Sequence, residues 1–438
     1  MTRSLLSLIA LAFLACAAPA VATLQDGDML GPSNWQDAQG LLPDEILEHY
    51  RLGEYLNRIA DLSKPGYIGV QYPPDFQAAS RANRGRFALA DNGSIVERAT
   101  GRQPRYIMGL PFPDLDPADP QIATKIIWNY FYSAWYNGNE HFLNELLLLN
   151  QRQVERRIVT DVQTLLYDGA PEARDRPNPE NLLMQRFARV TWPRDLDGTV
   201  SLTWRYRDPA QHDSLWTYVP GLRRVRTVDP LNRSDGFLGS DISLDDGYFF
   251  DAKPEDFTFR LLERRDQLVL MDPYSIRGEA EILPIPEGGW RILWKDAPRI
   301  GADSPDWHGL PWAPISAVLV RRPMWIIEAI PKDPRYLYGR VILRFDVETY
   351  QGSFASKYDR AGKLLLTYQA ATGAFYTGDG GKTYISAGGT TVRTGENFYY
   401  KRATVVLFPP RRRENPSDYR IPLATNLFTV DALTRIGK

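Results

Sequence analysis

Cysteine is almost absent from this 438-residue chain, and the only one is Cys16. It ends an apolar run at 5–16 that follows Arg3 and precedes Ala-Val-Ala at 20–22, which is the three-part layout of a secretory signal peptide. We expect residues 1–22 to be removed at this A-x-A site, after Ala22. The mature protein would then have no disulfide, no thiolate metal site and no cysteine nucleophile. Lipidation of Cys16 is the weaker alternative, because Phe13 occupies the position where a lipoprotein signal normally has leucine.

The chain also lacks a second long apolar run and an excess of charge of either sign. Its most apolar later stretch, 142–150, is too short to cross a membrane, which takes about 20 residues. Lys and Arg number 52 against 53 Asp and Glu, for a net charge of −1. A nucleic-acid binder needs a strong positive field, so this class is excluded. The sequence predicts a soluble protein exported to the periplasm.

Catalytic motifs are missing as well. The four histidines, His49, His141, His212 and His308, are scattered, and no H-E-x-x-H spacing occurs. No G-x-S-x-G elbow, P-loop or strand-bound G-x-G-x-x-G is present. We therefore predict no metal, no cofactor and no catalytic residue. Acidic residues are frequent, as in 240–257, so a hydrolase that uses two carboxylates remains an alternative.

Helical patterns are confined to the first third of the chain. Residues 43–62 and 119–149 read as helical, the second with a break near Gly138, and 64–119 reads as extended and irregular. From about Gln153 the apolar period is two, as in 199–208 and 339–348, which predicts antiparallel strands with one wet face. We divide the mature chain into a helical and irregular region at 23–152 and a sheet region at 153–438, forming one structural unit.

Residues 214–228, SLWTYVPGLRRVRTV, read as a β-hairpin that turns at Pro220-Gly221. One arm carries Trp216 and Tyr218 on the same face, and the other carries Arg223, Arg224 and Arg226. The aromatic face is expected to point inward and the guanidinium groups to stay in water. The same arginines are candidates for contact with lipid head groups or with a partner.

Several segments, taken in order, resemble a family of exported Gram-negative proteins that is catalogued as a domain of unknown function and often labelled outer-membrane lipoprotein-sorting protein. They are IMGLPFPDLDPADPQIATKIIWNYFY, WTYVPGLRRVRTV, GSDISLDDGYFFDAKPEDFTFRLLERRD and MWIIEAIPKDPRYLYGRVILRFDVETYQGSFASKYDRAGKLL. The resemblance implies an α+β, mainly β fold like that of LolA and LolB. In that fold a strongly curved antiparallel sheet, a half-barrel, wraps around a few helices and shelters acyl chains in its concavity. It also implies a periplasmic setting beside transporters of the RND superfamily, and it brings no catalytic residues.

These observations favour a periplasmic carrier or chaperone for a lipid or other hydrophobic molecule, with an RND-type transporter and the outer-membrane surface as partners. The candidate ligand-lining residues are Trp204, Tyr206, Trp216 and Tyr218, on adjacent expected strands. The same four residues could instead be core that packs against the aromatic helix at 128–136. Two other functions stay open: a carboxylate-dependent hydrolase of envelope glycan or lipid, and a docking module of an envelope complex without enzymatic activity.

Overall fold

The computed structural model describes residues 24–68, 72–279, 281–293, 298–376, 384–407 and 417–438. Side chains are described for all of these residues except those within 374–390. The expected signal peptide and Cys16 lie outside these residues. The described α-helices are α1 Asp44–Leu52, α2 Pro74–Ala82, α3 Ile122–Trp135 and α4 Val430–Ile436. None of them is long and apolar enough to cross a membrane.

In chain order, the earlier strands are β1 Met29–Leu30, β2 Asn57–Ala60, β3 Phe87–Leu89, β4 Ile95–Glu97, β5 Glu140–Asn150, β6 Val154–Leu166, β7 Leu182–Trp192, β8 Val200–Tyr206, β9 Ser214–Val219 and β10 Arg224–Val228. The later strands are β11 Phe257–Met271, β12 Glu281–Pro284, β13 Trp290–Leu293, β14 Val318–Pro331, β15 Arg340–Asp346, β16 Gly352–Tyr358, β17 Leu364–Tyr376, β18 Tyr384–Asn397, β19 Arg402–Leu407 and β20 Ser417–Tyr419.

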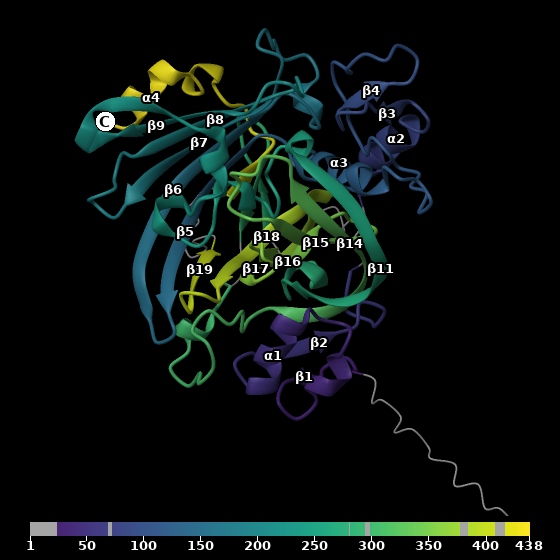
Figure 1. Ribbon diagram of the computed structural model, residues 1–438, viewed down its shortest axis with the longest axis vertical. Coiled ribbons are helices and arrows are strands. Elements are labelled where there is room, and N and C mark those ends of the chain that lie inside the picture. Colours follow the sequence, from purple (N-terminus) through teal and green to yellow (C-terminus); the bar gives the residue numbers. More distant parts are fainter. Residues whose placement is uncertain (1–23, 69–71, 280, 294–297, 377–383, 408–416) are drawn as a thin grey trace, which may run out of the picture.

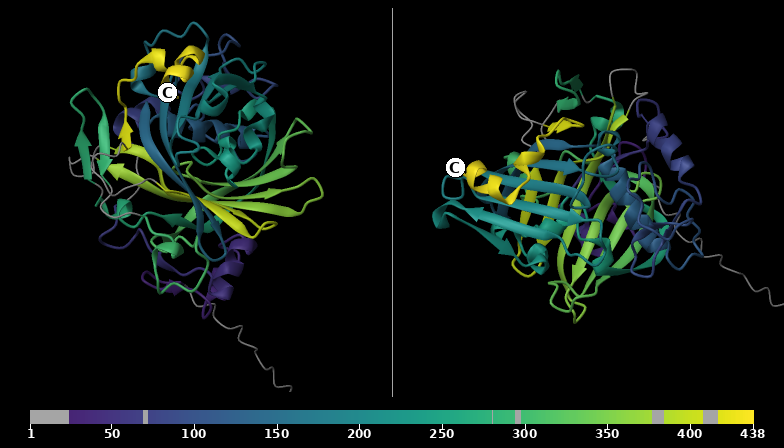
Figure 2. Two further views of the ribbon diagram at one scale, coloured as in Figure 1. Left: turned by 90° about the vertical axis from the view of Figure 1, so that its left-hand side faces the viewer. Right: turned by 90° about the horizontal axis from the view of Figure 1, so that it is seen from above.

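Most of these strands form one large curved sheet (Figures 1 and 2). Its main path is antiparallel throughout, in the order β10-β9-β8-β7-β6-β5-β19-β18-β17-β16-β15-β14-β11. The short strands β3 and β4 pair separately. The predicted mainly β, α+β fold with a strongly curved antiparallel sheet is confirmed.

The outermost strands of this path are consecutive in sequence. Among the described residues β10 pairs only with β9, and β11 pairs with β14 apart from a single bridge between Met271 and Thr372. The segment 229–256 therefore runs from one edge strand to the other, and it does so through the concave side of the sheet. We call it the crossing segment. It contains four short 3-10 turns, Pro230–Ser234, Phe237–Gly239, Leu244–Asp246 and Pro254–Asp256.

The main hydrophobic core fills the concave side. Helix α3 has no glycine or proline to interrupt it and is buried on nearly every side, so it forms the centre of this core. Its Tyr130 ring lies 5.0 Å from Phe345 of β15, and Phe249 of the crossing segment lies 5.4 Å from the same phenylalanine. Sheet, helix and crossing segment are thus packed as one body.

A second core covers the opposite, convex side of the sheet. Here α1 and its neighbours, at the bottom of Figure 1, pack against strands from both halves of the meander, including Leu147 of β5 and Val405 of β19. Helix α1 is preceded by Pro43 and ends at Gly53, whose left-handed φ of 74° closes the helix. The sheet therefore has little exposed apolar face in this region. The division at residue 152 stays a prediction.

Three of the expected elements were wrong. The helix expected over 43–62 ends at Leu52, and Asn57–Ala60 is strand β2. Residues 142–150 belong to strand β5 and not to the end of a helix, since α3 stops at Trp135 and Gly138 follows with a φ of 83°. In the stretch expected to be irregular, 64–119, the structure has helix α2 and the β3–β4 hairpin. The expected hairpin at 214–228 is confirmed as β9 and β10.

Candidate functional site

Strands β5, β6 and β7 build a wall on the concave side. Their antiparallel register places Glu140 opposite Thr164 and Thr164 opposite Arg186, which makes a polar row across the three strands. Two residues further along, Phe142, Val162 and Ala188 make an apolar row. Because side chains alternate between the faces of a strand, both rows point to the same side. The wall is polar at one level and apolar at the next.

The crossing segment lies against this wall and is held by contacts to both halves of the sheet. Tyr248 donates a hydrogen bond to Glu140 of β5, and Arg393 of β18 donates to the carbonyl of Gly247. Lys357 of β16 pairs with Asp246, and the hydroxyl of Tyr368 of β17 lies 3.0 Å from the carbonyl oxygen of Asp246. The segment is therefore fixed in place by side chains from distant strands.

A cavity remains between the crossing segment and the wall. It encloses about 110 Å³ within a hollow of about 890 Å³ that includes space open to solvent. Its apolar lining is Phe142, Leu146, Val162, Ala188, Phe237, Ile242, Leu244 and Val406. Its polar lining includes Glu140, Asn144, Thr160, Arg186, Tyr248, Arg393 and Tyr419. Mostly apolar walls with a few convergent polar groups are typical of a small-molecule site.

Glu140 is the titratable group that stands out in this cavity. It is 1 % exposed, and burial raises the pKa of its carboxyl to about 7, although Tyr248 donates a hydrogen bond to it and Arg186 and Arg393 attract its charged form. The Arg186 guanidinium also lies 4.9 Å from the centre of the Tyr248 ring. Near neutral pH this carboxyl is therefore present in both its charged and its neutral form.

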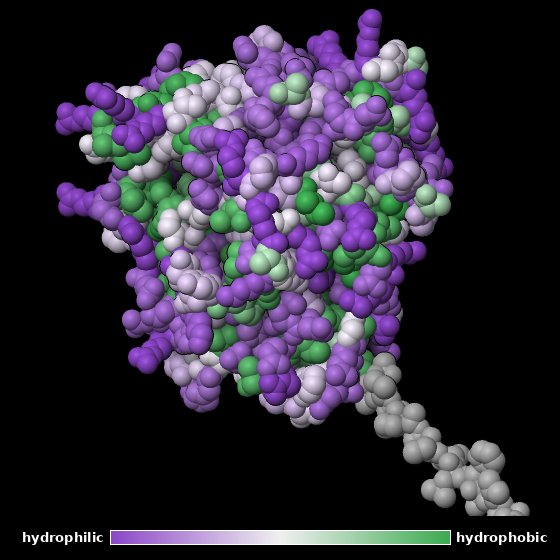
Figure 3. Space-filling model, in the orientation of Figure 1, coloured by the Kyte–Doolittle hydropathy of each residue, from purple (hydrophilic) through white to green (hydrophobic). Residues whose placement is uncertain are grey.

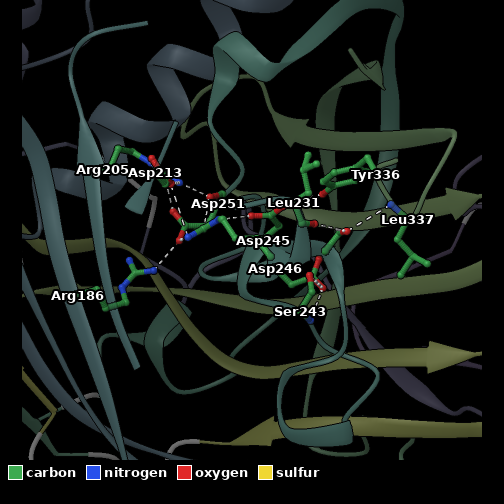
Figure 4. Close-up of polar contacts among 12 residues, drawn as sticks. Arg186, Arg205, Asp213, Leu231, Ser243, Asp245, Asp246, Asp251, Tyr336 and Leu337 are labelled. Atoms are coloured by element: carbon green, nitrogen blue, oxygen red, sulfur yellow. Dashed lines mark hydrogen bonds and ion pairs between the residues drawn. The ribbon is translucent and has the colours of Figure 1, made fainter. Parts of the chain in front are cut away.

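Next to the cavity, three arginines and three aspartates form a buried ionic cluster (Figure 4). Its ion pairs are Arg186–Asp251 at 2.6 Å, Arg205–Asp213 at 2.8 Å, Arg205–Asp251 at 3.1 Å and Arg233–Asp245 at 2.7 Å. Arg186 and Arg205 come from the sheet, whereas Arg233, Asp245 and Asp251 belong to the crossing segment. The cluster thus ties the segment to β7 and β8 by charge.

The pKa values in the cluster follow from its geometry. Burial disfavours the charged form of Asp251, but the positive charges of Arg186 and Arg205 outweigh burial and hold the pKa below its ordinary value. Asp213 is held low in the same way by Arg205. Burial prevails at Asp245, whose pKa is raised although Arg233 opposes the shift. Asp213 and Asp251 therefore act as permanent counter-ions and not as proton donors.

A second, larger cavity of about 450 Å³ lies on the other side of the crossing segment, between it and the β14–β15 turn. Its lining is mainly charged and includes Asp229, Arg233, Lys253, Lys332 and Arg335. Phe257 and Tyr336 line it as well, so its walls are both charged and apolar. In the described part of the chain no group of three or more His, Cys, Asp or Glu side chains could hold a metal ion.

The four aromatic residues expected to contact a ligand come together on the opposite side of the sheet from the cavity. Trp204 and Trp216 meet edge to face with their ring centres 5.4 Å apart, and Tyr206 and Tyr218 belong to the same cluster. The C-terminal segment around α4 covers them, and its Phe428 carbonyl accepts a hydrogen bond from Trp204 at 2.9 Å (Figure 2). Their packing partner is thus α4, and not the aromatic helix α3. That they contact a ligand stays a prediction.

The arginines of the hairpin are exposed. Arg223, Arg224 and Arg226 lie at and beyond the β9–β10 turn, where Arg223 has a left-handed φ of 49°. Leu222 beside them is 48 % exposed. Elsewhere this view of the surface is largely hydrophilic, with apolar residues in scattered patches (Figure 3).

None of the four residues expected to contact a ligand lines the cavity beside the crossing segment. The strand expected within 199–208 was predicted to have one wet face, to which Arg205 and Arg207 belong by alternation. Both are buried, because Arg205 meets Asp251 of the crossing segment and Arg207 meets Asp168. The signal that existed was the run of aspartates at 241–251, which supplies several of the counter-ions. Its pairing with the arginines depends on the fold.

Solved structures with some likeness to this chain have low identity. An outer membrane lipoprotein-sorting protein domain from Vibrio parahaemolyticus is 18% identical, with a TM-score of 0.45, over 71% of this chain and 97% of that one. A DUF1329 family protein from Desulfovibrio piger is 14% identical, with a TM-score of 0.43, over 69% and 97%. A LolA superfamily protein from Nitrosomonas europaea is 13% identical, with a TM-score of 0.40, over 72% and 99%.

The search of curated proteins found no match. Among protein families, residues 68–282 match the one described as "Protein of unknown function (DUF1329)". This region contains the wall strands β5–β7, the hairpin and the whole crossing segment. Over these residues, which are just under half of the chain, the sequence is similar to the DUF1329 family.

Proposed function

We propose that this protein is a periplasmic carrier or chaperone that holds a lipid or another hydrophobic molecule in the cavity between β5–β7 and the crossing segment. The observation that carries the proposal is the cavity itself: apolar residues from sheet and segment face one another, and polar groups gather at one level of the wall. Such a site takes an apolar chain and fixes one polar end.

A rigid surround suits this task. The ionic cluster and the contact between the rings of Phe250 and Phe131 of α3 hold the crossing segment in place before any ligand arrives. A preformed site loses less conformational entropy on binding than one that must be ordered. We therefore expect the segment to serve as a fixed wall.

The experiment is native mass spectrometry of the protein purified from the periplasm without detergent. We expect a co-purifying hydrophobic molecule, released by organic extraction. The matched variants are Ala188→Phe, which places a ring in the cavity, and Ala361→Phe in the exposed β16–β17 turn. Ala188→Phe should lose the adduct and Ala361→Phe should keep it. A clean mass for the wild type, repeated after incubation with envelope lipids, would reject the carrier.

The hydrolase alternative has one supporting observation. Glu140 has a pKa near 7 and lines the cavity together with Asp246, so an acid and a second carboxylate are present. Asp246, however, is paired with Lys357 and accepts a hydrogen bond from Ser243 at 2.8 Å. If Glu140→Gln left ligand binding intact but caused the bound molecule to accumulate as an unhydrolysed precursor, the result would favour a hydrolase over a carrier.

We further propose that the exposed hairpin contacts the partner, whether the outer-membrane surface or an RND-type transporter. Arg223, Arg224 and Arg226 would meet anionic groups, and Leu222 at the turn would add apolar contact. Exchange of all three arginines for glutamine should abolish co-sedimentation with vesicles of anionic phospholipid while leaving the cavity ligand in place. Unchanged co-sedimentation would remove the hairpin from the proposal and leave a docking role without support.

A further inference from the structure

The polar level of the cavity contains a buried cation that lacks a dedicated counter-ion. Arg393 is 8 % exposed, and its hydrogen bonds go to the carbonyl of Gly247 and to Asn144 Oδ1, both of which are uncharged. Within the described residues no ion pair joins it to a carboxylate. A buried guanidinium without a compensating negative charge is unfavourable.

The neighbouring arginine has spare donor capacity as well. Arg186 lines the same cavity, donates through Nε to Thr164 Oγ1 at 3.0 Å, and donates through Nη1 to Asp251 Oδ2 at 2.6 Å. Its remaining nitrogen, Nη2, is buried and has no hydrogen-bond partner. Asp251 is shared with Arg205 and Arg233, so it does not fully balance Arg186.

The charges around the cavity show what would complete it. Asp213, Asp245 and Asp251 are taken up by Arg186, Arg205 and Arg233, which leaves Arg393 as the excess cation. Glu140 is the nearby carboxyl that could balance the charge of Arg393. Glu140, however, also accepts a hydrogen bond from the hydroxyl of Tyr248 and exists partly in its neutral form. Beyond this polar level, Phe142, Val162 and Ala188 offer an apolar wall.

We infer that the cavity binds an amphiphile with an anionic head group, whose head lies at Arg186 and Arg393 and whose chain lies along Phe142, Val162 and Ala188. The inference rests on the proposed function and names the class of molecule carried. A carboxylate or phosphate oxygen would accept from Arg186 Nη2 and supply the charge that Arg393 lacks. Because the head and Glu140 compete for the same cations, binding should be accompanied by proton uptake at Glu140.

Isothermal titration calorimetry with four probes that share a dodecyl chain tests this inference. The probes are dodecanoate, dodecyl phosphate, dodecanol and dodecyltrimethylammonium, each below its micelle concentration. We expect both anions to bind at least about tenfold more tightly than dodecanol, which corresponds to one charge-assisted contact. Comparison of dodecanoate with dodecyl phosphate separates a fatty-acid source from a phospholipid source.

Variants assign the effect to the residues named. Arg393→Met should lower the affinity for the anions about tenfold and leave dodecanol unchanged. Arg152→Met, in the exposed β5–β6 turn, is the matched control and should change neither. The charged and titratable groups that face Glu140 are Arg186, Arg393, Tyr248, Tyr419 and Asp251. We expect Glu140 itself, and none of these neighbours, to titrate between pH 6 and 8. Glu140→Gln should therefore remove any increase in anion affinity at pH 6 relative to pH 8.

The outcomes separate the two proposals. Equal affinity for dodecanol and dodecanoate would overturn the anionic head group and leave the carrier standing. Tighter binding of dodecyltrimethylammonium than of the anions would overturn it as well. No binding of any of the four probes would overturn both the inference and the proposed cavity.

Discussion

Arg205 and Asp213 form an ion pair that is closed to solvent. Arg205 Nη2 and Nε lie 2.8 and 3.1 Å from Asp213 Oδ2, and the two side chains are 1 % and 2 % exposed. The same guanidinium reaches Asp251 Oδ1 at 3.1 Å, so two aspartates from outside β8 converge on one arginine of the sheet. The stability of the fold therefore depends on every member of these pairs, because loss of one partner leaves an unpaired charge in the interior.

Removal of the shared carboxylate should therefore be costly. Asp251→Asn leaves Arg186, Arg205 and Arg233 without a common counter-ion, and we expect the free energy of unfolding to fall by about 3 to 5 kcal/mol. Urea denaturation followed by far-UV circular dichroism measures it. The control is Asp195→Asn, which breaks an exposed pair with Arg156 and should cost less than about 1 kcal/mol. Equal effects of the two substitutions would contradict a stabilising role for the cluster.

His49 predicts how stability changes with pH. It lies between Glu54 at 2.6 Å and Glu396 at 3.0 Å. Burial alone would lower the pKa of His49, but the contacts with Glu396 and Glu54 together outweigh burial and raise the pKa to about 9. A pKa raised above the unfolded value of 6.5 stabilises the fold fully below pH 6.5, and this stabilisation is lost as pH rises through 9.

We therefore expect the free energy of unfolding to fall by up to about 3 kcal/mol between pH 6.5 and 9 because of this group. The measurement is urea denaturation at several pH values in wild type and in His49→Gln. The difference between the two proteins should narrow over this interval. A difference that is independent of pH would show that His49 is neutral in the folded protein.

The close approach of Phe249 to Gly352 gives a prediction of opposite type, in which an atom is added. A Cβ at position 352 would lie 1.9 Å from Phe249 Cδ1, so the crossing segment or β16 must shift. Gly352→Ala should destabilise the protein by about 1 to 3 kcal/mol, as overpacking does. Gly221→Ala is the control, because a methyl group added there would have no atom within 4 Å outside its chain neighbours. Differential scanning calorimetry should separate the two, and a Gly352→Ala protein as stable as wild type would contradict tight packing of the segment.

Phe428 should decide the role of the four aromatic residues under α4. It is fully buried and its ring lies 5.3 Å from Phe187. Phe428→Ala should lower the free energy of unfolding by about 3 to 5 kcal/mol and shift tryptophan emission to the red, since Trp204 and Trp216 would meet water. Tyr399→Ala, at a side chain 64 % exposed, should do neither. If Phe428→Ala were instead well tolerated and abolished ligand binding, these aromatics would line a second site.

The strands were predictable where one face is apolar and the other polar in local sequence. This is so for β15, in which Val341, Leu343 and Phe345 share one face as expected, although Arg344 and Asp346 on the face expected to be wet are buried. Strand β5 was not, because Leu146 packs in the concave core while Leu147 and Leu149 pack in the convex one. A strand buried on both faces shows a continuous apolar run, and periodicity does not distinguish it from a buried helix.

The cavity could not be predicted from the sequence for another reason. Its polar level joins Glu140 to Tyr248 across 108 positions and Arg393 to Gly247 across 146. Alternation correctly placed Arg205 opposite the aromatic face of its strand, yet whether that face meets water or aspartate depends on the path of the crossing segment. The local sequence pattern predicts which face of a strand a residue lies on, but it does not predict which segment of the chain covers that face.

The route of the crossing segment also has a consequence for how the chain folds. Its anchors come from β5, β7, β8, β16, β17 and β18, and the pair of Lys357 with Asp246 alone closes a loop of 111 residues. Loops of this length are slow to close, and they are rewarded only when both ends are already ordered. We therefore expect the segment to be secured last, after strands on either side of it have formed. Until then the arginines and aspartates that later meet would remain hydrated, and we expect this stretch of high charge to keep the chain soluble while the apolar faces of the sheet are still open.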